Sequence, residues 1–219
     1  MKIKNNMTIE LNNWKLTIDI EDPNKKDRPL EIVPPELLTF QHPHFINKPE
    51  CITFKAECGG KTTKNSKYPR SELRELDQGK LAAWSINRGT HIMTWTCSVT
   101  NLPIKKPQVV VGQIHDGEDD VVEIRHTKDY VEVIHDSNNY GKLITGYKLG
   151  DIYTVIMTAS KGQITIFSGK TTIAVKTKSK EKDCYFKLGC YTQSNVSKGD
   201  AEDAYGEVKV YKIKVEHKK

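Results

Sequence analysis

The sequence predicts an all-β protein with a β-sandwich or jelly-roll architecture. Short runs rich in valine, isoleucine, threonine and tyrosine recur about every ten residues along the chain, with turn-forming residues between them. No long stretch carries an apolar period of 3.6 residues, so long amphipathic helices are not expected. Many short strands at regular spacing are typical of antiparallel sandwiches and jelly rolls.

The expected strands follow one another along the whole chain. Residues 14–20 and 51–57 alternate apolar and polar side chains, as half-buried strands do. Residues 109–115 begin with three valines in a row, which is typical of a central strand. The other expected strands are 91–99, 121–126, 130–135, 153–159, 163–167, 171–175, 184–193 and 207–216.

Turns and two short helical pieces are expected to connect these strands. Lys161-Gly162 and Ser168-Gly169-Lys170 have the composition of hairpin turns. Short helical segments are expected near residues 35–38 and 80–84. No linker or repeat divides the chain, and 219 residues suit one all-β domain, so residues 1–219 are expected to form a single domain.

The charge balance favours a polyanionic partner. The formal net charge is +6, and only five of the 34 basic residues are arginines, so the excess is mostly lysine. A diffuse lysine excess attracts polyanions without identifying one. No apolar run approaches the ~20 residues that a membrane-spanning helix needs, so no membrane partner is expected. The first six residues contain no apolar segment typical of a signal peptide, which leaves the compartment open.

The five cysteines are expected to be buried free thiols. An odd number cannot close into a complete disulfide framework, although one disulfide with three thiols stays possible. No Cys-x-x-Cys pair with the spacing of metal ligands occurs. We therefore expect no metal site.

One short strand places unusual charges on a single face. Arg70, Glu72 and Arg74 point to one side, while Ser71 and Leu73 point to the other. Arginine offers a planar fork of donors that fits a carboxylate. This face is consistent with a ladder of surface ion pairs or with a site that binds acidic groups.

A second strand ends with two polar side chains that could take part in catalysis. Gln113 and His115 share one face, and Ile114 points to the other. A glutamine amide can donate to an oxygen, and histidine exchanges a proton near neutral pH. Ordinary polar residues at a strand end are the alternative interpretation.

A third strand, residues 184–193, combines rings with polar groups. One face carries Tyr185, Lys187, Gly189, Tyr191 and Gln193, and the other face is mainly apolar. A glycine in mid-strand allows another group to approach the backbone closely. Tyrosine rings can pack on sugar rings while polar groups bind hydroxyls. If the three strands share one sheet, they form a surface that binds acidic groups and holds candidate acid and base residues.

These motifs resemble the three signature motifs of the alginate lyases of polysaccharide lyase family 7. The motifs are residues 70–75, Gln113-Ile114-His115 and residues 185–193, in the order in which the family has them. Trp14-Lys15-Leu16-Thr17 resembles the opening strand of the family, so the resemblance covers nearly the whole chain. It implies a β-jelly roll of two curved antiparallel sheets, with the substrate cleft on the concave sheet.

The resemblance also implies an activity and roles for individual residues. The family cleaves 1,4-linked uronates by β-elimination, leaves 4,5-unsaturated ends and uses no metal cofactor. By motif position, the catalytic residues are Arg70, Gln113, His115 and Tyr191. The substrate-binding residues are expected to be Glu72, Arg74, Tyr185, Lys187 and Gln193.

The chemistry of the elimination explains these residue types. The C5 proton beside a carboxylate becomes acidic only when that carboxylate is neutralised, a task suited to Arg70, Gln113 and His115. In syn elimination from mannuronate, Tyr191 takes the proton and returns it to the leaving oxygen, which requires cations that lower its pKa. In anti elimination from guluronate, His115 is the base and Tyr191 the acid. The sequence leaves both routes open.

Two features bear on the substrate. Within the family, isoleucine at the position of Ile114 is associated with guluronate-containing chains, which favours polyguluronate or mixed blocks, with glucuronan as an alternative. The acidic loop Asp116-Gly117-Glu118-Asp119-Asp120 directly follows His115, which is unexpected beside a cleft for a polyanion. It could face away, limit the length of bound chain, favour one subsite or hold a calcium ion.

Other classes of function compete with the lyase. A non-catalytic jelly-roll lectin for acidic polysaccharide needs no acid and base pair. A glycoside hydrolase needs two paired carboxylates, and Glu72 has no evident partner in the other motifs. We therefore expect a lyase that acts as a monomer on an acidic polysaccharide outside the cell or in a cell wall. Nucleic acid is not the expected partner.

Overall fold

A computed structural model of the chain describes residues 9–177 and 182–219. The amino-terminal residues in which no signal segment was recognised lie outside this part. Within it, sixteen strands and two single-turn 3₁₀ helices follow one another. The strands are β1 (Trp14–Asp22), β2 (Lys25–Ile32), β3 (Phe45–Asn47), β4 (Ile52–Glu57), β5 (Arg70–Asp77), β6 (Lys80–Leu81), β7 (Thr90–Asn101), β8 (Val109–His115), β9 (Asp120–His126), β10 (Tyr130–His135), β11 (Asn138–Thr145), β12 (Tyr153–Ser160), β13 (Gln163–Ser168), β14 (Thr171–Lys176), β15 (Tyr185–Thr192) and β16 (Tyr205–Lys218). The helices are η1 (Glu36–Leu38) and η2 (Val196–Lys198).

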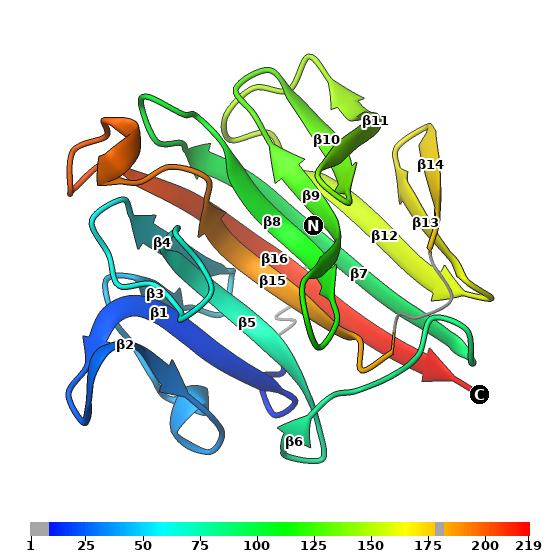
Figure 1. The fold of residues 1–219 in the computed structure, drawn as a ribbon, viewed down its shortest axis with the longest axis horizontal. Coiled ribbons are helices and arrows are strands. Elements are labelled where there is room, and N and C mark those ends of the chain that lie inside the picture. Colours follow the sequence, from blue (N-terminus) through cyan, green and yellow to red (C-terminus); the bar gives the residue numbers. More distant parts are fainter. Residues whose placement is uncertain (1–8, 178–181) are drawn as a thin grey trace, which may run out of the picture.

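The strands form two antiparallel sheets that lie face to face (Figure 1). The nine-stranded sheet has the order β11-β10-β9-β8-β15-β5-β1-β2, with β6 paired to the end of β5. The seven-stranded sheet has the order β14-β13-β12-β7-β16-β4-β3. The sandwich confirms the all-β, two-sheet architecture that the strand pattern predicted.

The core lies between the sheets and is built from alternate residues of each strand. From the nine-stranded sheet, Leu73, Ile114 and Phe186 are fully buried there, and Trp95 and Phe54 face them from the seven-stranded sheet. Because successive side chains alternate in a strand, this burial turns the residues between them to the outer face of the nine-stranded sheet. The core therefore determines which residues face the cleft.

All of the predicted strands are present, with bounds that differ by a few residues, and one predicted helix is not. The 3₁₀ turn at Glu36–Leu38 confirms the expectation for 35–38. The helical prediction for 80–84 was wrong, because Lys80–Leu81 pairs with β5 and Trp84 forms a bridge with Cys184.

Besides β6, three strands were not predicted. β2 pairs only with β1 along one side, and it is polar, largely exposed and interrupted by Pro29. β3 has only three residues, and β11 begins with the polar sequence Asn138-Asn139. Edge strands of this kind lack the apolar alternation on which the sequence prediction depends.

None of the five cysteines forms a disulfide, which confirms the expectation of thiols. Four of them are buried and Cys51 is half-buried. The part of the chain that the structure describes contains no group of three histidine, cysteine, aspartate or glutamate side chains able to hold a metal ion. The same residues form no helix long and apolar enough to cross a membrane.

Candidate active site

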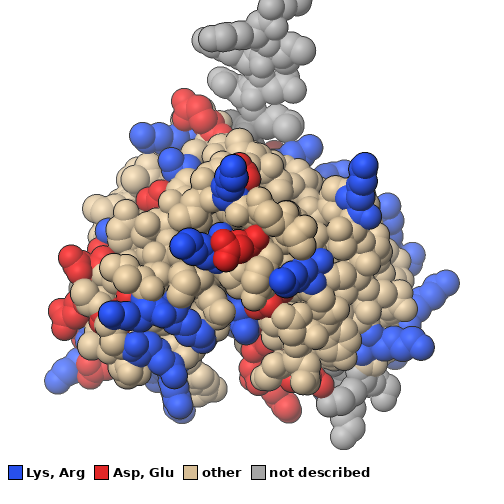
Figure 2. Space-filling model, turned by 90° about the horizontal axis from the view of Figure 1, so that it is seen from above, with Lys and Arg blue, Asp and Glu red and all other residues tan. Residues whose placement is uncertain are grey.

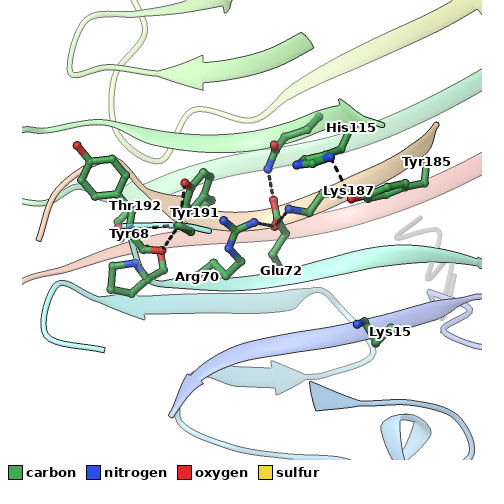
Figure 3. Close-up of polar contacts among 12 residues, drawn as sticks. Lys15, Tyr68, Arg70, Glu72, His115, Tyr185, Lys187, Tyr191 and Thr192 are labelled. Atoms are coloured by element: carbon green, nitrogen blue, oxygen red, sulfur yellow. Dashed lines mark hydrogen bonds and ion pairs between the residues drawn. The ribbon is translucent and has the colours of Figure 1, made fainter. Parts of the chain in front are cut away.

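The three polar strand faces predicted from the sequence lie side by side. β8, β15 and β5 are consecutive in the nine-stranded sheet. The register places Lys187 between Gln113 on one side and Arg74 on the other, and Tyr191 opposite Arg70. Their side chains project from the outer face into a cleft of about 670 Å³, and Figure 3 shows the central contacts.

Glu72 is the centre of the polar network in the cleft. Its carboxylate accepts hydrogen bonds from Arg70 Nη1 at 3.0 Å and Lys187 Nζ at 2.6 Å, and a short one from Gln113 Nε2 (Figure 3). Burial acts to raise the pKa of Glu72, but the Lys187 ammonium and the Arg70 guanidinium outweigh it and hold the pKa below its usual value. The network thus keeps a fully buried anion in place with its donors fixed around it.

Lys187 is a buried cation with an unusually low affinity for its proton. Burial is the main cause, and repulsion from Arg70 adds to it, so the pKa of Lys187 is lowered to about 8 despite the attraction of Glu72. The ammonium group is therefore charged at neutral pH and begins to lose its proton in mildly alkaline solution.

Tyr191 holds its proton in this structure. The Arg70 guanidinium lies 3.9 Å from the centroid of its ring, and its hydroxyl is 3.0 Å from Ser66 Oγ. Burial raises the pKa of Tyr191, and the opposing effects of Arg70 and Ser66 do not overcome it. The lowered pKa expected for a tyrosine base is not found, so Tyr191 is a phenol able to donate a proton.

His115 lies on the other side of the Glu72 network from Tyr191 (Figure 3), and it can accept a proton where Tyr191 can donate one. Its Nδ1 lies 2.7 Å from the carbonyl oxygen of Asp116, which can only accept, so in the neutral ring Nδ1 carries the hydrogen and Nε2 keeps the lone pair. Burial and the neighbouring Lys187 lower the pKa of His115. The ring is thus neutral at neutral pH and able to accept a proton at Nε2.

Arg74 and Tyr185 form a stacked pair beside His115. The Arg74 guanidinium lies 3.7 Å from the centroid of the Tyr185 ring, and the Tyr185 hydroxyl is 3.0 Å from His115 Nδ1. Among the described residues, the buried Nε atoms of Arg70 and Arg74 have no hydrogen-bond partner. The guanidinium groups are therefore held in the floor of the cleft by their ring and carboxylate contacts and not through these Nε atoms.

Eight of the nine predicted site residues line the cleft. Gln193 does not, because it follows the end of β15 and its buried amide donates to the carbonyl of Thr192 at 3.1 Å. The other eight residues were predicted from the alternation of side chains along a strand. The observed strands have this alternation, so the eight side chains lie on the expected face.

The sides of the cleft carry opposite charges, which the sequence did not show. One side, here called the basic lip, consists of Lys15, Lys25, Arg28 and Lys64 from β1, β2 and the loop between β4 and β5. The other, here called the acidic lip, consists of Glu118, Asp119 and Asp120. Figure 2 shows a notch at its lower edge with basic side chains on one side and acidic ones on the other. The acidic loop thus faces the cleft rather than away from it.

Within the acidic lip, Asp120 is a carboxyl group whose pKa is raised. Burial raises its pKa to about 7, and the nearby Glu123 and Asp119 carboxylates add to the effect. Glu123 lies behind it on β9 and pairs with Arg125 at 2.7 Å. The charge of this lip therefore changes within the physiological pH range.

Comparisons with known proteins agree with these features. The family model for alginate lyase matches residues 9–217. Among similar solved structures, the alginate lyase AlgAT5 of polysaccharide lyase family 7 is 42% identical, with 97% of each chain covered and a TM-score of 0.90. An alginate lyase from Corynebacterium sp. is 33% identical, with 96% of each chain covered and a TM-score of 0.88.

A third similar structure was determined with a ligand. It is a family 7 alginate lyase variant in complex with the substrate GGMG, 26% identical, with 97% of this chain and 96% of that chain covered and a TM-score of 0.82. A search of curated proteins found no match.

Proposed function

The chain belongs to the alginate lyases of polysaccharide lyase family 7 and is a polysaccharide lyase; from this premise we propose that it cleaves 1,4-linked uronate chains containing guluronate. The proposed reaction is an anti elimination with His115 as base and Tyr191 as acid. The observation that carries it is the division of protons in the cleft, where His115 is neutral and Tyr191 is protonated. Ile114 and the related enzyme with bound GGMG support a uronate chain of this kind.

The first step needs neutralisation of the substrate carboxylate. Arg70, Gln113 and Lys187 converge on Glu72 and are held with their donors directed into the cleft. In the proposed complex the Arg70 guanidinium and the Gln113 amide bind the carboxylate at C5. The charge that develops on this group as C5 loses its proton is stabilised by donors that are already in place.

The second step transfers one proton from the substrate to the enzyme and another from the enzyme to the leaving group. His115 Nε2 takes the C5 proton, and the Tyr191 hydroxyl gives its proton to the O4 leaving group. The C4–O4 bond breaks as the C4–C5 double bond forms, which yields a 4,5-unsaturated uronate end. A syn elimination by Tyr191 alone would require a tyrosinate, and burial disfavours that form here.

The direct test is to follow the ultraviolet absorbance of the unsaturated product. The enzyme is incubated in turn with polyguluronate, polymannuronate and glucuronan, and the fastest rise is expected with polyguluronate. A faster rise with polymannuronate would contradict the anti mechanism. An absorbance rise with glucuronan alone would identify glucuronan as the substrate instead. No rise on any chain, with binding retained, would instead indicate a lectin.

Tyr191→Phe tests the proposed acid. The variant keeps the ring under Arg70 but has no proton to give, so we expect turnover to fall by at least about 100-fold while binding of polyguluronate is largely retained. Tyr211→Phe is the matched control, because the Tyr211 hydroxyl contacts Ser98 in the seven-stranded sheet and lies outside the cleft lining. Near-normal turnover of Tyr191→Phe would remove this residue from its role.

A further inference from the structure

A buried carboxylate fills the fork where two strands of the active site separate. β5 and β15 pair from Tyr191 opposite Arg70 to Lys187 opposite Arg74. One step further, Phe186 N–H donates to the Glu75 side chain at 2.9 Å instead of to a backbone carbonyl. The Glu75 carboxylate thus continues the ladder after the backbone pairing has ended.

Glu75 also joins the active-site sheet to the opposite sheet. Its Oε2 accepts a second hydrogen bond from Trp84 Nε1 at 3.0 Å, and its Oε1 accepts one from His217 Nε2 at 2.6 Å. Only 3% of Glu75 is exposed, so a side chain that lost these donors would be a buried, unpaired anion. His217 belongs to β16, an interior strand of the seven-stranded sheet that lies between β7 and β4.

The hydrogen-bond partners determine the protonation of this chain of groups. His91 Nε2 lies 2.8 Å from the Arg88 carbonyl and so carries a hydrogen, while burial lowers the pKa of His91 and keeps the ring neutral. His91 Nδ1 is then an acceptor, and the His217 Nδ1 that lies 2.6 Å from it must donate. His217 therefore donates from both nitrogens, one of them to the Glu75 carboxylate.

The fork is adjacent to the catalytic network. Arg74 precedes Glu75 on β5, and Tyr185 precedes Phe186 on β15, so the residues on either side of the hydrogen bond form the stacked pair in the cleft. The Tyr185 hydroxyl in turn contacts His115 Nδ1. Any separation of the strands at Glu75 would move this pair and expose His115 to water.

We propose that Glu75, clamped by His217, is a positioning residue of the lyase reaction that holds Tyr185 and Arg74 against His115. The inference rests on the proposed function, because it assigns Glu75 an effect on the proposed base. Glu75 itself touches no substrate, since its side chain lies between the sheets and does not line the cleft. Its carboxylate is needed because three donors converge there, and an amide of the same size would place its own N–H against one of them.

Glu75→Gln is the central test. We expect kcat/KM on polyguluronate to fall about 10- to 100-fold, which is typical when catalytic groups shift by about 1 Å. We also expect the acid limb of the pH profile to move to higher pH, because water that reaches His115 reduces the burial that lowers its pKa. Amide hydrogen exchange of Phe186 should accelerate. A merely structural role would lower the melting temperature but leave the acid limb in place when assays are run well below it.

Two further variants complete the experiment. Glu207→Gln is the matched control, since Glu207 accepts from Thr100 Oγ1 in the opposite sheet, and it should match the wild type. His217→Gln keeps an N–H donor for Glu75 but removes the ring that also contacts His91, and a several-fold loss of kcat/KM is expected even if Glu75→Gln does not fold. Wild-type kcat/KM and acid limb in His217→Gln and in any folded Glu75→Gln would overturn the inference. A wild-type protein without lyase activity would refute the proposed function instead. In that case, an unchanged rate of amide hydrogen exchange at Phe186 in the variants would refute the role of Glu75 in holding the two strands together.

Discussion

At the scale of single residues, the cleft separates groups that keep their protons from groups that lack them. His115 and Tyr191 have pKa values displaced in opposite directions, both mainly by burial, so the proposed base is unprotonated and the proposed acid is protonated in the same pH range. Lys187 and Asp120 titrate closer to neutrality, with pKa values of about 8 and about 7. The pH dependence of the enzyme should report these four groups.

The pH profile of kcat/KM is expected to have two separate limbs. Activity should fall at acid pH as His115 gains a proton, at a pH below the ordinary histidine value because its pKa is lowered. It should fall again from about pH 8 upward, as Lys187 loses the charge that attracts the substrate. In Lys187→Arg the charge persists at high pH, so the alkaline limb should move upward while the acid limb stays. An unchanged alkaline limb would assign that limb to another group.

The acidic lip should weaken binding of a polyanion increasingly as pH rises. Asp120 carries its charge above about pH 7, so Asp120→Asn is expected to lower the KM for polyguluronate more at pH 8 than at pH 6. The repulsion between two like charges near a protein surface is on the order of 1 kcal/mol, which corresponds to a several-fold change in KM. Asp151→Asn, at an exposed position outside the cleft lining, is the control. An equal effect at both pH values would mean that Asp120 does not titrate in this range.

The sequence predicted the residues of the cleft floor and drew attention to the acidic loop beside it, but it did not predict the basic lip. Arg70, Lys187 and Tyr191 lie on strands whose alternation already places them on one face. The basic lip could not be found this way, because Lys25 and Arg28 reach the cleft only through the pairing of β2 with β1, and nothing in their local sequence marks it. Gln193, in contrast, was predicted to line the cleft and does not. The prediction continued the alternating pattern one residue beyond the end of β15.

At the scale of elements, β15 is the strand on which the site depends most. It pairs with β8 and β5 along both sides and contributes three residues to the cleft lining. Gly189, in its middle, was expected to allow a close approach of another group to the backbone. The approaching group is the neighbouring strand itself, since a Cβ at this position would overlap the Ser71 carbonyl oxygen.

Gly189→Ala should therefore destabilise the whole sandwich. Its φ of +155° is rarely adopted by residues with a side chain, and the new methyl group would lie 2.7 Å from Glu72 Cα, where only backbone movement can make room. We expect a loss of about 3 kcal/mol or more in the free energy of unfolding, measured by chemical denaturation. Gly117→Ala is the control, because its Cβ would meet nothing nearer than 3.9 Å. A similar small change in both variants would show that β5 and β15 can separate at little cost.

At the scale of the whole molecule, the net charge of +6 conceals an uneven distribution. The general excess of lysine suggested an unspecified polyanion, whereas the structure concentrates cations on one lip of the cleft and anions on the other. The architecture was predictable because spacing and alternation are properties of the whole sequence. The distribution of charge around the cleft was not, because it depends on which loops and edge strands meet in space.

The basic lip should contribute to binding through long-range attraction. Replacing Lys25 and Arg28 with alanine is expected to raise the KM for polyguluronate several-fold at low salt, with little change in kcat. The difference from the wild type should shrink as ionic strength rises, because salt screens exposed charges. The matched control replaces Lys142 and Lys170, two lysines that line a separate groove formed by β11, β12 and the β13–β14 turn. An equal effect of both pairs would mean that only net charge matters.

The position of the last two strands has a consequence for how the protein is made. β15 lies between β8 and β5, and β16 lies between β7 and β4, so each sheet receives a central strand from the final part of the described chain. During synthesis, the earlier hairpins emerge from the ribosome with a gap in each layer and with apolar faces uncovered. Neither layer can close until residues 185–218 have been made, so these contacts of high sequence separation form late and slow the folding. The unfinished edges are then the points at which a nascent chain is most exposed to aggregation and most in need of a chaperone.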